Sequence, residues 1–239
     1  MAKSVAGFPG FRPAAYEFLA GLAANNTRAW FAEHKAIYEA EVIAPFRLLL
    51  ADVISGLAAA EIPLTGDPAK AIFRIHRDVR FSKDKLPYKI HAGAVLRKIN
   101  GSRFDGILYL HIDPAGDRLA AGFYLPEKEA LEALREAIYV DPARFAAMQA
   151  DLRRAGLELN TTETLSRLPR GFEDAAHSPV ADALRLKSFT VSRDLSRAEL
   201  AKPAVVKKIV QFARDAEPLL RLGWQALTVL DPTALARRR

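Results

Sequence analysis

Arginine and lysine side chains recur at short intervals in the segment RDVRFSKDKLPYK, residues 77–89. A guanidinium group donates two parallel hydrogen bonds to a phosphate or a carboxylate, and lysine ammonium groups and hydroxyl groups add further donors. We therefore predict that a basic hairpin over residues 74–89 binds an anionic, phosphate-bearing ligand, either a nucleotide-like small molecule or nucleic acid. The candidate ligand-binding residues are Arg74, Arg77, Arg80, Ser82, Lys83, Lys85, Tyr88 and Lys89.

The positive charge of the chain is concentrated around this hairpin. Residues 70–103 hold ten basic and two acidic side chains, whereas the rest of the chain holds 25 basic and 26 acidic ones. The formal net charge of +7 therefore arises in one stretch. Eight excess charges about 15 Å apart repel one another by only about 1 kcal/mol in salt water, so the crowding permits an anionic ligand without requiring one.

Two other interpretations of the basic hairpin remain open. In the first, the protein is an enzyme acting on a phosphorylated substrate, in which the cations stabilise charge and His76 or Asp78 moves protons. In the second, the hairpin is a structural or partner-binding clasp. Arg77 lies in the apolar phase of the segment, between Ile75 and Val79, and would then pair with an acidic helix residue such as Glu33 or Glu41. In the same interpretation Asp78 and Asp84 pair with nearby basic residues.

Histidines occur on three consecutive predicted strands, at His76, His91 and His111, and Asp78 and Asp113 each follow a histidine by two residues. Residues two apart share a face of a strand, so strands in register would gather these groups into a metal or acid–base cluster. Isolated strand histidines are more often structural, so we assign no metal ligand. The absence of G-x-G-x-x-G and G-x-x-x-x-G-K-[ST] motifs predicts no cofactor.

The hydrophobic period indicates which elements position these residues. Helical spacing over residues 13–57, with Asn26 as an N-cap and Pro45 as a kink or restart, gives way to strand-like alternation. We expect an α+β fold in which a central, mostly antiparallel sheet of about five strands is flanked by N-terminal and C-terminal helices. The predicted strands are 71–81, 90–97, 107–113, 119–125 and 186–191, and the later helices are 127–138, 142–155 and a stripe following Ser196.

The composition indicates an ordinary globular chain. With no cysteine there is no disulfide framework and no thiolate metal site, and we expect no membrane span and a cytoplasmic location. We predict a single domain over residues 1–239, with flexible tails at 1–10 and 232–239. The oligomeric state is left open.

Two longer motifs, NNTRAWFAEHKAIYE (25–39) and FRIHRDVRFSKDKLPYK (73–89), together resemble a known family. The chain is similar to the bacterial proteins grouped as domain of unknown function family 2461, and GFYLPE (122–127) and LKSF (186–189) extend the resemblance. It spans roughly Phe11 to Leu222. The family has no established activity to carry over, so the resemblance implies no catalytic residue.

Overall fold

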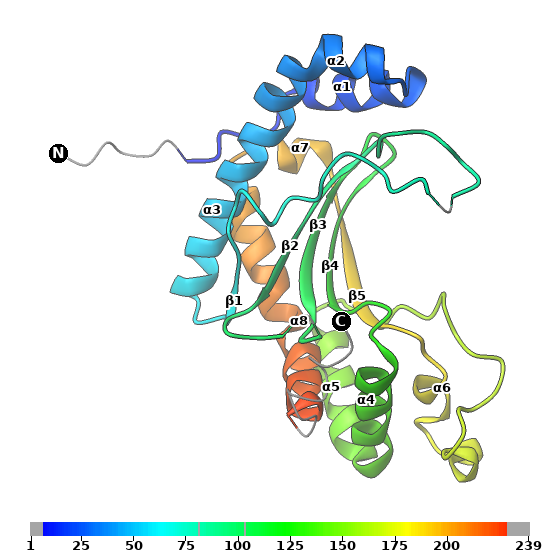
Figure 1. Cartoon of the computed structure of the whole chain (residues 1–239). Helices are drawn as coiled ribbons and strands as arrows, with labels where there is room; N and C mark the ends of the chain where they lie inside the picture. Colours follow the sequence, from blue (N-terminus) through cyan, green and yellow to red (C-terminus); the bar gives the residue numbers. More distant parts are fainter. Residues whose placement is uncertain (1–6, 81, 103, 229–239) are drawn as a thin grey trace. The chain divides into compact units, whose positions relative to one another are not determined.

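A five-stranded antiparallel sheet with flanking helices forms the fold, and this confirms the predicted α+β class. The structure is a computed structural model that describes residues 7–80, 82–102 and 104–228. The strands follow one another across the sheet in chain order (Figure 1). They are β1 (Leu64–Thr65), β2 (Ala92–Lys98), β3 (Ile107–Ile112), β4 (Asp117–Phe123) and β5 (Phe189–Leu195).

The chain divides into two compact units. Unit 1 takes in the described residues of Met1–Leu96, Tyr109–Leu119 and Arg193–Phe212, and unit 2 those of Arg97–Leu108, Ala120–Ser192 and Ala213–Arg239. The single-domain assignment stays a prediction. Within the predicted N-terminal tail, Phe8 is buried and its backbone N–H donates to Asp52 Oδ2 at 2.7 Å, so residue 8 packs on unit 1. The predicted tail 232–239 and residues 1–6 lie outside the described residues.

Unit 1 holds the N-terminal helices and the beginning of the last helix. Asn26 does not cap the second of these helices, because Thr27 does so by accepting the N–H of Trp30. Pro45 lies in the first turn of a helix that follows directly on a π-helical turn. The elements are α1 (Pro13–Ala24), α2 (Arg28–Ile37), η1 (Tyr38–Ile43), α3 (Ala44–Ala59), α7 (Arg197–Leu200) and the first part of α8 (Val205–Leu227).

Unit 2 contains helices before and after residues 156–179, which the sequence predicted to be irregular. Within that stretch lies one short 3₁₀ helix, η2 (Glu173–His177). The two helices predicted at 127–138 and 142–155 are present, and Pro142 opens the second beside its N-cap Asp141. The fifth strand begins three residues later than predicted, because Leu186 makes only an isolated bridge, to Thr164. The helices are α4 (Lys128–Val140), α5 (Pro142–Arg154), η2 (Glu173–His177), α6 (Ala181–Leu184) and the remainder of α8.

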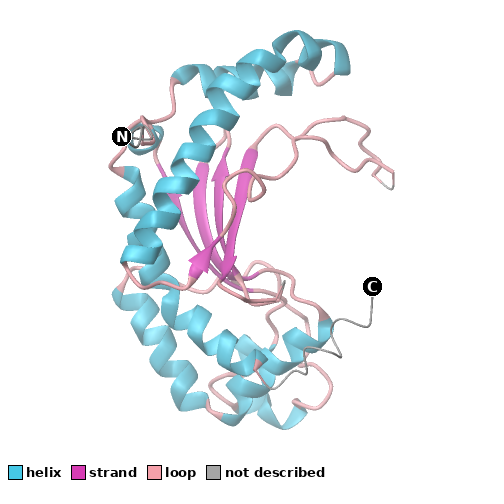
Figure 2. Cartoon of the chain, turned by 60° about the vertical axis from the view of Figure 1, so that its left-hand side comes forward, coloured by secondary structure: helices cyan, strands magenta, loops and turns pink. Residues whose placement is uncertain are grey.

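Side chains alternate between two faces along the central strands. Ala92 and Ala94 on β2 and Leu110 and Ile112 on β3 are buried, and α3 runs along one face of the strands in Figure 2. The residues between them point the other way and are mostly half-buried. We call the side that carries His91, Gly93, Tyr109 and His111 the open face.

The predicted strand 71–81 is wrong. Only its first half pairs, through isolated bridges between Ile72 and Ala94 and between His76 and Tyr88, and the described residues 77–80 and 82–87 form a loop that extends away from the strands (Figure 1, teal). The physical reason is local, since Asp78 and Asp84 each accept the backbone N–H two residues ahead, which competes with ladder pairing. The short β1 takes the place beside β2 instead. Phe81 lies outside the described residues.

One helical stretch, Arg28–Ala59, is long and apolar enough by composition to cross a membrane, which the sequence analysis did not expect. The core helix of a soluble protein passes the same test. Its α3 portion buries Phe46, Leu49, Leu50, Val53 and Leu57. This packing accounts for part of the apolar composition, since 39% of the most apolar window is buried. The absence of a membrane contact stays a prediction.

Candidate functional site

The outer part of the basic hairpin, residues 77–86, pairs its arginines internally, and we call it the tip. Arg77 Nη1 lies 2.5 Å from Asp84 Oδ2, and Arg80 Nη2 lies 2.7 Å from Asp78 Oδ2. The arginine hydrogen bonds lower the pKa of both carboxyls below the usual range. The prediction that Arg77 pairs with Glu33 or Glu41 is therefore wrong, because its partner is Asp84. Glu41 pairs with Arg12 instead.

The other predicted residues of the tip point mostly to solvent. Lys85 Nζ donates to the carbonyl of Val79 at 2.9 Å. Lys83 is exposed and Ser82 is half-buried. Lys83 has no ion pair with any residue that the structure describes.

Tyr88 anchors the hairpin to the N-terminal helices. It is 6% exposed, and its ring stacks on Phe31 with centroids 4.4 Å apart. Asn26, which was predicted as a cap, accepts the N–H of Tyr88 and donates to its carbonyl, both at 3.0 Å. The His76 ring lies 5.1 Å from that of Tyr88, so it belongs to this anchor as well. The contact of Tyr88 with a ligand stays a prediction, which its burial does not favour.

Two cations at the base of the hairpin, Arg74 and Lys89, have a different environment. Lys89 is half-buried, and its Nζ lies 5.2 Å from the centroid of the Phe73 ring. Burial and the charge of Arg74 lower the pKa of Lys89. Among the described residues, neither cation has a carboxylate within ion-pair distance.

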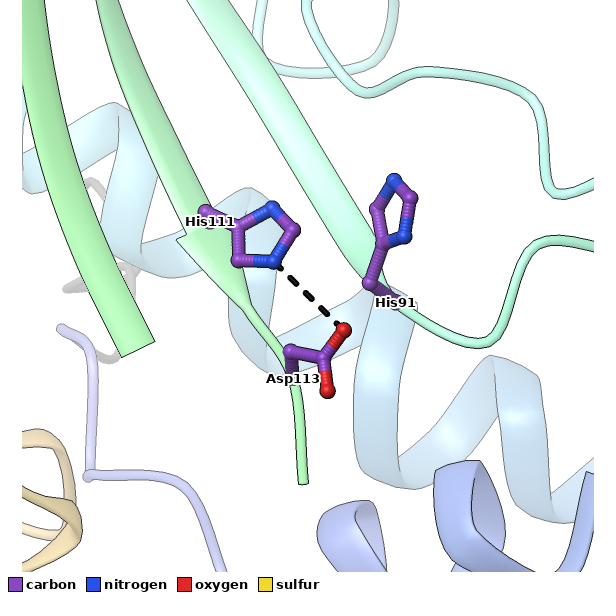
Figure 3. Close-up of side chains that lie close together, drawn as sticks. All are labelled: His91, His111 and Asp113. Atoms are coloured by element: carbon purple, nitrogen blue, oxygen red, sulfur yellow. Dashed lines mark ion pairs between the residues drawn. The ribbon is translucent and has the colours of Figure 1, made fainter. Parts of the chain in front are cut away.

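Next to these cations, the open face brings together two histidines and a carboxylate (Figure 3). One ligand atom from each of His91, His111 and Asp113 lies within 4.8 Å of the others. His111 Nε2 is 3.5 Å from Asp113 Oδ2, and the two imidazole centroids are 4.7 Å apart. These are donor types that bind a transition metal ion.

Tyr109 fixes the orientation of His111. Its hydroxyl lies 2.7 Å from His111 Nδ1, which leaves Nε2 directed toward Asp113. Gly93 on the neighbouring strand makes room for this ring, because a Cβ there would lie 2.9 Å from the Tyr109 hydroxyl. Burial, and then the charge of Asp113, raise the pKa of Tyr109, so the group stays a hydroxyl at neutral pH.

Asp113 is held by the turn that follows β3. Its backbone N–H donates to Asp117 Oδ1 at 3.0 Å, and its own Oδ1 accepts the N–H of Ala115 at 2.8 Å. Asp117 is 2% exposed and also accepts the hydroxyl of Tyr16 at 2.8 Å. Burial raises the pKa of Asp117.

These residues form one continuous surface, which we call the open-face cluster. The Phe73 and Tyr109 centroids are 6.1 Å apart, so the base of the hairpin adjoins the histidines. Burial is the main factor that lowers the pKa of His91, and the charges of His111 and Lys89 act in the same direction. The cluster consists of Phe73, Lys89, His91, Tyr109, His111 and Asp113.

The sequence predicted part of this arrangement. It singled out His91, His111 and Asp113 as possible members of one cluster, and these three meet. His76 and Asp78 do not join them, because His76 packs on Tyr88 and Asp78 pairs with Arg80. Tyr109 was not predicted to belong here, although it lies two residues before His111 and therefore on the same face of the strand.

Comparison with known proteins gives a family and no function. No curated protein and no solved structure matches the chain. A family model described as "Conserved hypothetical protein (DUF2461)" matches residues 14–221, so the chain belongs to this family.

Proposed function

We propose that the protein binds an anionic, phosphate-bearing small molecule through Arg74 and Lys89 at the base of the basic hairpin. The observation that carries this proposal is the difference in pairing along the hairpin. The tip arginines hold carboxylates, whereas Arg74 and Lys89 have no carboxylate partner among the described residues and lie within each other's electrostatic field. The charge of Arg74 also acts on Asp78, but that carboxylate is hydrogen-bonded to Arg80. Two neighbouring cations without an ion-paired acid of their own favour an anion between them.

The side chains around Lys89 favour a nucleotide-like ligand. Phe73 is 40% exposed and lies directly beneath the Lys89 ammonium. An exposed ring next to a cation can stack a base while the cation holds a phosphate. Two charge-assisted contacts of about 1.5–3 kcal/mol each and one stacked ring of about 1–3 kcal/mol sum to about 4–9 kcal/mol. An association cost of at least about 4 kcal/mol leaves a dissociation constant no tighter than about 0.1–1 mM.

Calorimetric titration of chelator-treated protein with pyrophosphate and with ADP tests the proposal. We expect the Arg74→Ala/Lys89→Ala variant to bind at least about 10-fold more weakly than the natural chain, and raised salt to weaken binding. The Arg77→Ala/Arg80→Ala variant is the matched control. It removes the same charge from the same hairpin, and its affinity should change by less than about 3-fold.

Three outcomes would count against the proposal. Binding that the base variant leaves unchanged, or that the tip variant weakens equally, would show that Arg74 and Lys89 are not the site. A response that is flat in salt would exclude an electrostatic contact. Tight binding of a single-stranded oligonucleotide, with none of ADP, would place nucleic acid ahead of a small molecule.

A further inference from the structure

We propose that His91, His111 and Asp113 form a binding site for a divalent first-row transition metal ion, and zinc is the ion that we test first. Two imidazoles and one carboxylate, with no thiolate, make a donor set that such ions accept. This inference goes beyond anion binding and stands without it.

The distances require little rearrangement. Ligand atoms about 2.0–2.1 Å from a tetrahedral zinc ion lie about 3.3 Å from one another. His111 Nε2 and Asp113 Oδ2 are already 3.5 Å apart, and all three ligand atoms lie within 4.8 Å. In Figure 3 the His91 ring stands beside His111 and Asp113, with its nitrogens at the top and on the side away from His111. The proposed site therefore requires the His91 side chain to rotate when the ion binds.

The surroundings of the three residues match those of a metal site. A metal-bound histidine usually donates its second ring N–H to a fixed acceptor, which sets the direction of the coordinating nitrogen. Tyr109 Oη fills this place at His111 Nδ1. Asp113 is fixed in turn by Ala115 and Asp117, so two of the three ligands are oriented by neighbours.

An ion pair between His111 and Asp113 alone does not account for His91. A second imidazole at a centroid distance of 4.7 Å adds no hydrogen bond to that pair. If it were protonated, it would repel a protonated His111. A metal ion is the partner that uses a nitrogen from each ring together with the carboxylate.

Three protein ligands leave at least one coordination position open. The ligands are half-buried, so water reaches that position. Lys89 Nζ lies 5.2 Å from the Phe73 centroid, and that ring is 6.1 Å from the Tyr109 ring, so the cation lies near this side of the cluster. If the proposed function is correct, and only then, a phosphate oxygen of the ligand would complete the coordination.

Calorimetry on the full chain tests the metal site. Untagged protein is first treated with a chelator and then titrated with zinc chloride. The buffer contains no phosphate, so that anion binding does not enter the measurement. We expect one ion per chain with a dissociation constant below about 10 µM. The His91→Asn and Asp113→Asn variants should each lose more than about 100-fold in affinity, since even neighbours of ligands account for 10–100-fold.

The matched control is the His76→Asn/His177→Asn variant, which removes two histidines outside the cluster and should bind zinc as the natural chain does. Circular dichroism checks that each variant folds. Cobalt absorption of the unaltered chain gives a second readout, because ligand-field bands of a four- or five-coordinate ion support the site. Absence of saturable zinc binding, retained affinity in His91→Asn and Asp113→Asn, or a cobalt spectrum of the hydrated ion would each overturn the proposal.

Discussion

The tip of the basic hairpin and the open-face cluster both gather ionisable side chains, and they hold them in opposite ways. At the tip, Arg80 and Asp78 are 77% and 59% exposed and pair with each other across two positions of sequence. In the cluster, His111 and Asp113 are 23% and 15% exposed and are fixed by Tyr109 and Asp117. A high density of charge therefore identifies a region of positive potential, while burial and support identify where side chains are held in place.

This difference follows from how each region is assembled. The tip carboxylates accept backbone N–H groups two residues ahead, so its pairs form within one short loop. The cluster joins residues about twenty positions apart through the register of β2 and β3. Only the cluster depends on the folded sheet. Variants that disturb the sheet should therefore disturb the cluster and leave the ion pairs of the tip in place.

The largest effect on stability is expected from Asp117→Ala, which removes the buried support of the cluster. The change leaves the Tyr16 hydroxyl and the Asp113 N–H without their acceptor, at about 1–3 kcal/mol for each buried group. Burial raises the pKa of Asp117, so the charged carboxylate is itself disfavoured there, and its removal offsets part of this loss. We expect the free energy of unfolding to fall by about 2–3 kcal/mol, measured by urea denaturation.

Asp194→Ala is the control for this measurement. Asp194 also belongs to unit 1 and is ion-paired, with Arg118, but its side chain is 78% exposed. Its replacement should change the free energy of unfolding by less than about 1 kcal/mol. Equal losses in the two variants would mean that burial does not distinguish the support of the cluster from a surface pair.

A smaller and more specific effect is expected from Gly93→Ala. The added methyl group would lie 2.9 Å from the Tyr109 hydroxyl, and the ring must move away from His111. Because only the far end of a side chain moves, the free energy of unfolding should change by less than about 1 kcal/mol. Zinc affinity should fall by about 10-fold, as it should in Tyr109→Phe, because both changes remove the same hydrogen bond.

A double-variant cycle sharpens this test. If Gly93→Ala acts only through the Tyr109 hydroxyl, the combined variant should bind zinc no more weakly than the weaker of the two single variants. Gly66→Ala is the control, because its added methyl group also meets a side chain in unit 1, that of Leu96, but away from the cluster. Additive losses, or an equal loss in Gly66→Ala, would remove Tyr109 from the positioning of His111.

The sequence allowed the face of the sheet to be predicted but not the membership of the site. Alternation placed His111 and Asp113 in one phase, which needs only the period of a strand, whereas His91 joins them only through the register between strands, which the sequence left open. The exclusion of His76 could not be predicted, because it depends on Asn26 holding Tyr88 from 62 positions away. The pairing of Arg77 was missed for the opposite reason, since its partner Asp84 lies in the same loop and the helix acids were considered first.

The α+β class was predictable because hydrophobic periodicity changes visibly at residue 71 and again after Pro126. The boundaries of the strands were less predictable. Leu186 continues the apolar pattern of the fifth strand, yet its neighbours pair with residues 163–165 instead. Pairing of this kind is set by tertiary contacts, which a one-dimensional pattern does not contain.

The smallest effect is expected from the tip variant, Arg77→Ala/Arg80→Ala. This variant tests the comparison at the tip, whereas the preceding ones test it at the cluster. Its ion pairs involve largely exposed groups, so the melting temperature should fall by less than about 3 °C. The ion pairs lower the pKa of Asp78 and Asp84 in the folded chain. A carboxyl group of this kind stabilises the fold at any pH above the ordinary carboxyl pKa, and this contribution is lost as the pH falls through the lowered pKa. The difference in melting temperature between the natural chain and the variant should therefore be present at neutral pH and vanish in acid. A much larger loss at neutral pH would make the tip a structural clasp, and the contrast between a self-paired loop and a supported cluster would fail.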